Sequence, residues 1–443
     1  MAEKISSAKL SEIFFFTGIF LLASAMSIGI FLILIASIIS LFNKKDNPFK
    51  DKWSKGLIII SILMLISCSY QTFNQTNKDL LDWDISLTWI GLLNWIPFFY
   101  LFIISKDFLK NSTQRKKIAI LLLSGSIPVL ITGFGQYFLN WEGPLSSFYG
   151  LIIWYLKPIE PHLGLSALFS NQNYAGTWLS IVWPFSLALF FIDKDKLYKR
   201  ICALLILFLI TIAIILTTSR NALLGLLISI PIVMGIKILF LLLILSLLLI
   251  FIFSFQTSLP FSKEIINVFS DIFPKQFINK FHKFDLNNIF EYRRINLWKD
   301  SINLISKNPL FGLGAASFPI LYELYYETNL YTEQHTHNLF LEVSFGYGFI
   351  VSSILFLFIF SIIYLSWRKI ILNKSHLKDS LINKSWFASS IVLLISQMND
   401  ITYYDGRISV IFWILLSGLR NIIDENSDSS KSNTLIKMHH SNN

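Results

Sequence analysis

Long apolar runs without a charged residue constrain this chain more than any other feature of its sequence. A helix needs about 20 apolar residues to cross roughly 30 Å of hydrocarbon, and residues 201–218, 238–255 and 344–367 reach or approach that length. Only 14% of the 443 residues are charged, whereas soluble domains carry about 25%. The sequence therefore predicts an all-α integral membrane protein.

We expect membrane spans along most of the chain, together with one or two spans in the first apolar run, residues 13–42. As a single helix that run would be about 45 Å long at about 1.5 Å per residue, which exceeds one crossing. The small residues Ser24, Ser27 and Gly29 can mark a break within it. One span there gives eleven in total; two spans, which we favour, give about 12 transmembrane helices. The other expected spans are residues 56–75, 85–105, 117–137, 172–192, 201–219, 221–236, 238–256, 344–367, 386–399 and 408–419.

Short basic loops between the spans predict the orientation. The net charge of +10 gathers in loops 43–55, 106–117, 193–200 and 368–385. Lysine and arginine favour the cytoplasmic side of a membrane, and these four loops alternate correctly with the remaining ones. The basic charge is therefore an orientation signal and does not indicate a nucleic-acid partner.

This orientation divides the chain into four parts. They are an N-terminal transmembrane bundle (1–256), a large external loop (257–343), C-terminal transmembrane helices (344–420) and a cytoplasmic tail (421–443). Within the loop, Asp285 or Asn287 can cap a helix that continues through Trp298. The tail is rich in serine, asparagine and lysine, and we expect it to be disordered.

Two external segments carry arginines that need a partner. Arg220 lies in the sequence TTSRNA between two apolar stretches, where a guanidinium persists with a partner or a cavity, or by extending to the interface. Arg293 and Arg294 are adjacent in the sequence EYRRINLW. Adjacent residues point to different helix faces, so we expect only one to reach a ligand, unless the pair is a solvated face.

Two further external segments carry glycines and histidines. Gly312 and Gly314 permit a tight turn and a close approach to an anion or to a neighbouring helix. His335 and His337, in the sequence HTHNLFLE, stand just before an apolar span. An imidazole at this boundary suits proton transfer near neutral pH, although it can also simply bond to loop backbone. No further cluster supplies the remaining ligands of a metal, so we expect none.

In order and spacing these motifs resemble the O-antigen ligase and O-antigen polymerase superfamily. The motifs on which the resemblance rests are SRNA, RINLW, PLFGLGAASF and HTHNLFLE, preceded by the sequence FSNQNYAG at residues 169–176. The resemblance covers residues 165–365 in motif detail and the rest in span layout.

The resemblance implies an inverting, metal-independent glycosyl transferase of the inner (plasma) membrane, without a cofactor and with its active site facing the periplasm. Its expected partners are an undecaprenyl-pyrophosphate-linked glycan donor, a glycan or lipid-linked sugar acceptor, and membrane lipid. Carried over by position, Arg220, Arg294 and His337 match the catalytic residues.

Four neighbouring residues are expected to bind substrate. Arg293, His335 and Asn338 flank the matched positions. Arg407, in the sequence DITYYDGR at residues 400–407, lies outside the family pattern and shares only the predicted external side.

The competing interpretation is a transporter of a small anion such as bicarbonate. A transporter should carry ionisable groups near the membrane midplane and often contains repeated halves. Here the predicted spans are nearly free of charge, the candidate residues gather on one side, and no internal repeat is evident. Glycan transfer is therefore the favoured interpretation.

Overall fold

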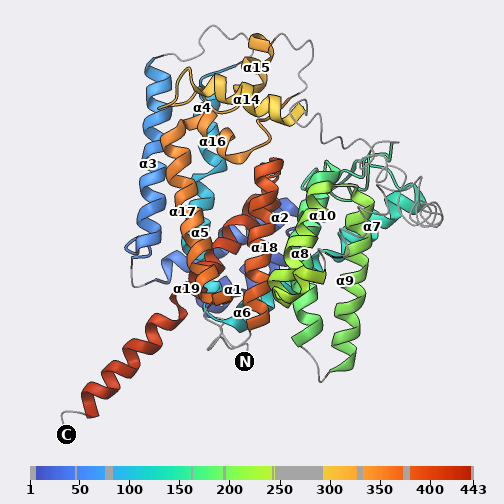
Figure 1. Cartoon of the computed structure of the whole chain (residues 1–443), viewed down its shortest axis with the longest axis vertical. Helices are drawn as coiled ribbons and strands as arrows, with labels where there is room; N and C mark the ends of the chain where they lie inside the picture. Colours follow the sequence, from blue (N-terminus) through green and yellow to red (C-terminus); the bar gives the residue numbers. More distant parts are fainter. Residues whose placement is uncertain are drawn as a thin grey trace.

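A computed structural model of the whole chain gives the fold (Figure 1). It describes residues 6–44, 47–74, 83–160, 163–192, 196–241, 244, 293–326, 333–372 and 380–440, with side chains as far as Glu425. The expected span at 238–256 lies largely outside these residues. Residues 257–292 and 327–332 of the expected loop lie wholly outside them, as do the proposed helix caps Asp285 and Asn287.

The described residues are mostly helical, and many of the helices are long enough to cross a membrane. By length and composition, seven described helices qualify: Lys52–Phe73, Ser86–Phe108, Ser112–Leu139, Gln172–Ile192, Leu197–Thr217, Phe349–Leu372 and Gly406–Glu425. The all-α, multi-pass membrane class is therefore confirmed, whereas the number of twelve spans stays a prediction.

The first apolar run forms two helices rather than one. Helix α1 (Ser7–Leu21) and helix α2 (Met26–Phe42) are joined by a turn at residues 22–25. The Ser7 hydroxyl donates to the side-chain oxygen of Asn43 over 2.8 Å, so the two ends of the pair lie together. A Cβ on Gly18 would approach the Gly29 carbonyl oxygen to 2.7 Å, which means that glycine is needed for this close packing. The predicted break is confirmed.

The next part of the chain adds further helices and a pair of short strands. Helix α3 (Lys52–Phe73) is capped by Asp51, whose carboxylate accepts from the Trp53 and Ser54 amides. The elements that follow are α4 (Ser86–Gly91), η1 (Leu92–Asn94), α5 (Ile96–Ser105), η2 (Lys106–Phe108), α6 (Ser112–Gly125), α7 (Ile127–Leu139) and the antiparallel strands β1 (Leu145–Ser147) and β2 (Ile152–Trp154).

The rest of the chain supplies the interior and one capping layer. Its elements are α8 (Gln172–Ile192), α9 (Leu197–Thr217), α10 (Arg220–Met234), α14 (Arg293–Ile305), α15 (Phe318–Tyr326), α16 (Leu339–Tyr347), α17 (Phe349–Trp367), the π-helical turn η4 (Arg368–Leu372), α18 (Ser380–Asn399) and α19 (Gly406–His440). Figure 1 shows α14, α15 and α16 together at one end of the bundle. Because α19 continues to His440, the backbone expected to be disordered after residue 421 is helical as far as that residue.

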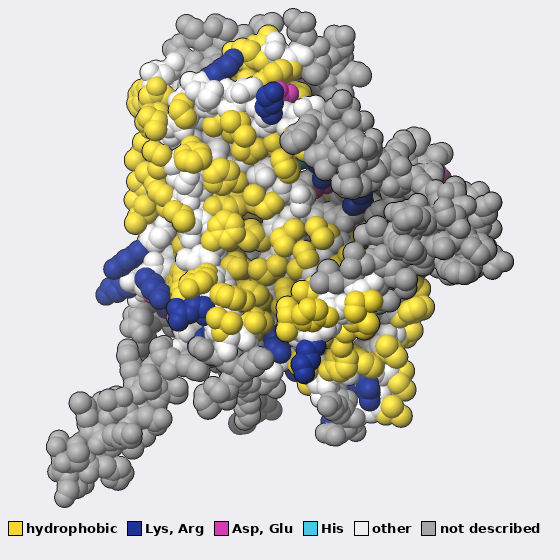
Figure 2. Space-filling view, viewed as in Figure 1, with side chains coloured by type: hydrophobic (Ala, Val, Ile, Leu, Met, Phe, Trp, Pro, Cys, Tyr) yellow, Lys and Arg dark blue, Asp and Glu magenta, His cyan; other side chains and the backbone are white. Residues whose placement is uncertain are grey.

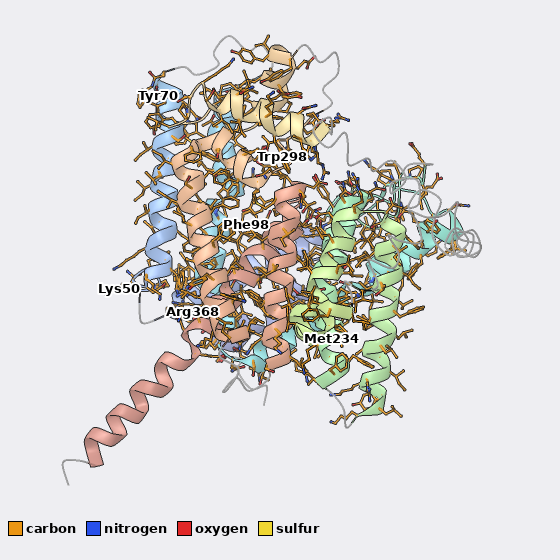
Figure 3. All side chains as sticks on the ribbon, in the orientation of Figure 1. Lys50, Tyr70, Phe98, Met234, Trp298 and Arg368 are labelled. Carbon is orange, nitrogen blue, oxygen red and sulfur yellow. The ribbon has the colours of Figure 1, made fainter. Side chains whose placement is uncertain are left out.

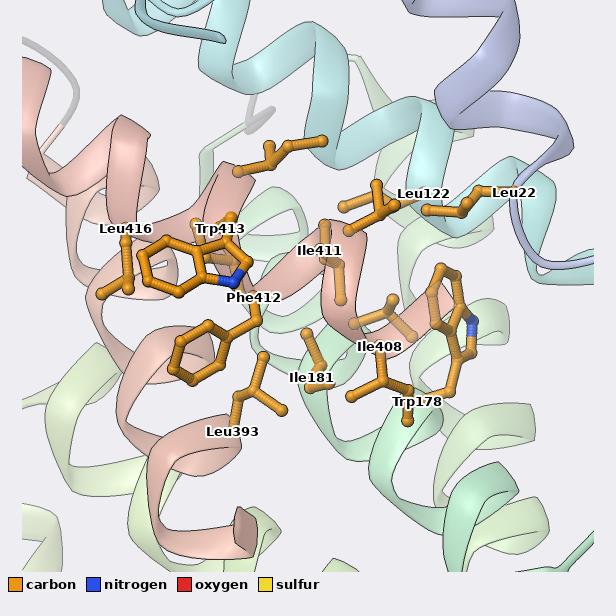
Figure 4. Packing of buried hydrophobic residues seen from close by; sticks show 14 of the residues in the cluster. Leu22, Leu122, Trp178, Ile181, Leu393, Ile408, Ile411, Phe412, Trp413 and Leu416 are labelled. Atoms are coloured by element: carbon orange, nitrogen blue, oxygen red, sulfur yellow. The ribbon is translucent and has the colours of Figure 1, made fainter. Parts of the chain in front are cut away.

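Helices α8, α18 and α19 form the packed centre. Figure 4 shows Trp178 and Ile181 of α8 beside Ile408, Ile411 and Trp413 of α19, all of them buried. The Trp386 indole on α18 donates to the Leu415 carbonyl over 2.8 Å. Burial of these large side chains fixes α18 between its neighbours, and α18 carries part of the site at its C-terminal end.

The span expected at 344–367 is broken by Gly348. This residue has φ 95°, and a Cβ on it would lie 2.0 Å from the Leu310 carbonyl oxygen. The Phe349 amide donates to the Pro309 carbonyl and the Leu313 amide to the Phe345 carbonyl, each over 2.7 Å. The glycine-containing segment 309–314 therefore packs against the α16–α17 junction, which is one of the two roles expected for it.

The two ends of the bundle differ in charge. Figure 2 shows lysine and arginine side chains along the lower edge of a broad apolar band. Figure 3 places Lys50 and Arg368 at that edge and Tyr70 and Trp298 at the opposite one. We call these the basic end and the loop end. At the basic end the fully buried Arg115 pairs with Glu425 at 2.8 Å, which anchors α19 there.

Substituted-cysteine labelling tests this orientation. In a variant without Cys68 and Cys202, we expect a membrane-impermeant maleimide to label Lys307→Cys in intact cells. Lys196→Cys and Ser7→Cys should react only after the membrane is opened, because the basic end is predicted to be cytoplasmic. Labelling of Lys307→Cys only from inside would contradict the orientation, and labelling of Ser7→Cys from outside would contradict two crossings by α1 and α2.

Candidate active site

His337 is held in a fixed position at the start of α16. Its backbone is left-handed, with φ 52°, a conformation that non-glycine residues adopt rarely. The next residue, Asn338, caps α16: its side-chain oxygen accepts from the Phe340 and Leu341 amides at 3.0 and 3.2 Å. Its side-chain nitrogen donates to the Met398 carbonyl of α18 over 3.1 Å. Asn338 thus joins α16 to α18 and turns the His337 side chain toward the end of α18.

The His337 ring lies between two carboxylates. Its Nδ1 is 2.8 Å from Asp400 Oδ1, and its Nε2 is 3.1 Å from Glu333 Oε2. Asp400 follows the last residue of α18 and also accepts from the Asn173 side-chain nitrogen over 2.8 Å. Both carboxylate residues are only 7% exposed. The site therefore joins residues from α8, α18 and the loop before α16.

Each carboxylate also meets one of the paired arginines. Arg293 forms an ion pair with Glu333, and Arg294 lies 3.7 Å from Asp400 Oδ2. Both residues stand at the start of α14 and keep much of their side chains exposed. The sequence predicts that only one of them reaches a ligand, and in the structure both lie beside the carboxylates that flank His337.

Arg220 lies near the same end of α18. It is the first residue of α10, which Ser219 caps. Its neighbour Asn221 donates to the Ser396 hydroxyl over 2.9 Å, and Ser396 is four residues, or about 6 Å of helix, before Asp400. The Arg220 side chain is exposed, and no described residue forms an ion pair or hydrogen bond with it.

The sequence at the start of α8 sets this geometry. A Cβ on Gly176 would come within 2.9 Å of the Ser219 and Ala222 side chains, so glycine lets the start of α10 pack directly on α8. Three residues earlier, Asn173 reaches Asp400. The short motif at residues 173–176 thus positions both Asn173 and the start of α10, where Arg220 lies.

The two carboxylates control the charge of His337. Burial alone lowers the pKa of the imidazole, but the hydrogen bonds to Asp400 and Glu333, together with the Asp400 charge, outweigh burial and raise the pKa to about 9. Burial likewise raises the pKa of both carboxyls, yet His337 and the arginines reverse this and hold each pKa below its usual value. At neutral pH the resting site contains an imidazolium between two carboxylates.

His335 has different surroundings. Its Nδ1 lies 3.8 Å from Glu342 Oε1, and its ring lies 5.1 Å from that of Tyr404. The Tyr404 hydroxyl donates to the same Glu342 oxygen over 3.2 Å. Burial is the main cause that lowers the pKa of His335 below its usual value, so this histidine is neutral at pH 7. The two histidines therefore differ in charge and do not act as a pair.

Arg407 is not brought to this group. Its guanidinium donates twice to Asp405, at 2.8 and 2.5 Å, and stacks 3.8 Å from the centre of the Phe169 ring. It is 4% exposed. Asp405 thus pairs with the guanidinium that we expected to bind substrate, and Arg407 holds the start of α19 in place.

Sequence reasoning gave no role to Asp400 and none to Asn173. Asp400 is a carboxylate at the end of an otherwise almost uncharged span, and such a group is a functional candidate in itself. Its contact with His337, 63 residues away in the chain, cannot be predicted from the residues next to either one. No described group of three or more histidine, cysteine, aspartate or glutamate side chains could hold a metal ion.

Comparison with known families bears on the same region. Residues 204–357 match the model of a family described as O-antigen ligase. The matched segment contains Arg220, Arg294 and His337, whereas Asp400 and Asn173 lie outside it. The resemblance drawn from the sequence motifs is thereby confirmed. No curated protein matches the chain.

The cap at Asn338 predicts a change in stability. Asn338→Ala removes both the cap of α16 and the bond to α18, so we expect a loss of about 0.5–2 kcal/mol in the free energy of unfolding. Asn338→Asp keeps the cap acceptor and should lose less. Thermal unfolding of the protein in nanodiscs measures both. Equal stability of Asn338→Ala and the unchanged protein would contradict the structural role.

Proposed function

We propose that this protein transfers a glycan from a polyprenyl-pyrophosphate carrier to a sugar hydroxyl, because residues 204–357 match the model of the family described as O-antigen ligase. The observation that carries the proposal is the imidazole held between Asp400 and Glu333, with Arg293 and Arg294 beside it and Arg220 nearby. The reaction is inverting, needs no metal and takes place at the periplasmic face.

The arginines suit the leaving group. Departure of the pyrophosphate develops negative charge, which fixed cations stabilise most strongly in the transition state. A guanidinium can also donate two parallel hydrogen bonds to phosphate oxygens. Arg220 has no partner within the described residues, and Arg294 is 3.7 Å from its carboxylate and 42% exposed. We assign the pyrophosphate to these two, with Arg293 as a further contact.

His337 suits the proton transfer. Asp400 at Nδ1 fixes the tautomer and leaves Nε2 as the basic nitrogen, as in other histidine–carboxylate pairs. The acceptor oxygen forms a bond to the anomeric carbon, the bond from that carbon to the pyrophosphate oxygen breaks, and the hydroxyl proton passes to Nε2. In the resting site Glu333 occupies Nε2. An arriving pyrophosphate attracts Arg293 and repels Glu333, which frees Nε2 for the acceptor.

The proposed chemistry is common to two kinds of acceptor. The acceptor decides between a ligase, which uses a lipid-anchored core sugar, and a polymerase, which uses another carrier-linked chain. Transport of a small anion, the alternative from sequence, gains no support from the family match.

Transfer by the purified protein tests the proposal directly. The protein in nanodiscs is incubated with a polyprenyl-pyrophosphate glycan and either a core lipid or a second carrier-linked glycan, with EDTA present throughout. We expect a lengthened product from one acceptor and the opposite anomeric configuration at the new bond. Absence of transfer with both acceptors, in protein that binds the donor, would contradict the proposed activity.

Substitutions separate the assigned roles. Arg220→Lys and Arg294→Lys should raise the KM for donor and lower kcat, because lysine loses the paired hydrogen bonds. His337→Ala should still bind the donor but lose about 10²- to 10⁴-fold in kcat. His335→Ala should have a milder effect on kcat than His337→Ala, because its described carboxylate partner is Glu342 rather than Asp400 or Glu333. Turnover by folded His337→Ala close to that of the unchanged protein would remove this residue from the mechanism.

The raised pKa of His337 predicts the pH dependence. A base acts when unprotonated, so a pKa raised to about 9 moves its active range upward. We expect kcat/KM to rise about tenfold per pH unit from about pH 6 to 8 and to level off above about 9. Asp400→Asn removes a carboxylate that raises this pKa, so the midpoint should move to lower pH. A rate that instead falls through this range would mean that the imidazolium is the active form.

A further inference from the structure

A second feature lies beside the His337 site without sharing its groups. A cavity of about 340 Å³ opens between the ends of α4 and η1, the segment 314–319 and the C-terminal half of α16. His335 and Glu342 line it, whereas Arg220, Arg293, Arg294, Glu333, His337 and Asp400 do not. The cavity is therefore distinct from the proposed pyrophosphate site, yet it begins two residues from His337.

Its walls combine aromatic rings with a few polar side chains. The rings come from Trp95, Tyr347, Tyr404, Phe318 and Phe345, and the polar groups from Asn94, Gln334, His335 and Glu342. Small-molecule sites are mostly apolar with a small number of placed polar groups. A pyranose has the matching shape, because its C–H face packs on rings and its hydroxyl edge bonds to amides and carboxylates.

The charge of the cavity argues against a phosphate. No lysine or arginine lines it, and Glu342 is its acidic group. Burial lowers the pKa of His335, so this side chain adds no positive charge at neutral pH. An anion entering here would meet a carboxylate without a cation, whereas neutral hydroxyls can donate to that carboxylate.

The cavity is also shaped by two special residues. A Cβ on Gly91 would lie 2.4 Å from the Ala315 Cβ and 2.9 Å from the Tyr347 hydroxyl, so glycine allows α4 to pack closely against Ala315 and Tyr347 at this wall. The Tyr347 hydroxyl is buried and has no hydrogen-bond partner in the part of the chain that the structure describes. Buried polar groups are nearly always paired, and a ligand hydroxyl would satisfy this one.

We propose that this cavity is the subsite for the acceptor sugar, and that it presents the attacking hydroxyl to His337. The inference rests on the proposed transfer reaction, since that reaction defines what an acceptor is. The volume lies at the low end of the range of about 300–1,000 Å³ for small-molecule pockets. It fits one or two neutral sugar rings and not a long polyprenyl chain.

Asn94 provides the test because its side chain is exposed and makes no hydrogen bond within the described residues; only its backbone carbonyl accepts, from Tyr403. Asn94→Trp fills the cavity, and Asn94→Ala removes one amide. Leu93→Trp is the matched control, because Leu93 is 63% exposed and does not line the cavity. Saturation-transfer NMR with methyl glycosides of glucose, galactose and N-acetylglucosamine measures sugar binding in nanodiscs without requiring turnover.

We expect at least one glycoside to bind, and Asn94→Trp to reduce its signal about fivefold or more while Leu93→Trp leaves it unchanged. In the transfer assay Asn94→Trp should raise the KM for acceptor about tenfold and leave the KM for donor unchanged. Sugar binding that survives Asn94→Trp would overturn the acceptor assignment, even if transfer is observed. Displacement of the bound sugar by added farnesyl phosphate, seen as loss of the sugar signal, would overturn it as well. Sugar binding without any transfer would contradict the proposed function, and the cavity would then be a sugar-binding site that is not an acceptor subsite.

Discussion

The structure at the loop end depends on one partly buried group, the imidazole of His337 between two carboxylates. Removing charged groups from water is costly unless each is paired, and here every charge has a partner: Asp400 and Glu333 for the ring, Arg294 and Arg293 for the carboxylates. Segments from α14, α16 and α18 must therefore meet at one point. The close packing of α8, α18 and α19 below it keeps that point fixed.

Helices hold the site residues in position, and the side chains proposed to react lie at the helix ends. Asn338 caps α16 and bonds to α18, while Asn221 bonds α10 to α18 one helical turn before Asp400. These contacts use short polar side chains at helix termini, where backbone groups need partners in any case. A site built in this way has few degrees of freedom to lose when a substrate binds.

The sequence predicted the membrane class, the break in residues 13–42 and the gathering of His337, Arg220 and both paired arginines near one end. Apolar length and helix-terminal residues carry that information locally. The role of Asp400 could not be predicted, because its contact with His337 depends on how α18 packs. The surroundings of Arg407 could not be predicted for a similar reason: nothing in its position along the chain reveals that Asp405 and Phe169 enclose its guanidinium. The break at Gly348 likewise follows from a contact with distant Leu310.

The count of charges around His337 has a consequence for how the site recognises its ligand. Three guanidiniums and the imidazolium give four positive charges, and Glu333 and Asp400 give two negative ones, so the resting cluster carries an excess of two positive charges. A pyrophosphate that bridges a sugar and a lipid carries two ionised oxygens. The complex of the two is electroneutral. A carrier with a single phosphate would leave one positive charge of the cluster unmatched, so charge balance with the proposed donor favours a diphosphate over a monophosphate.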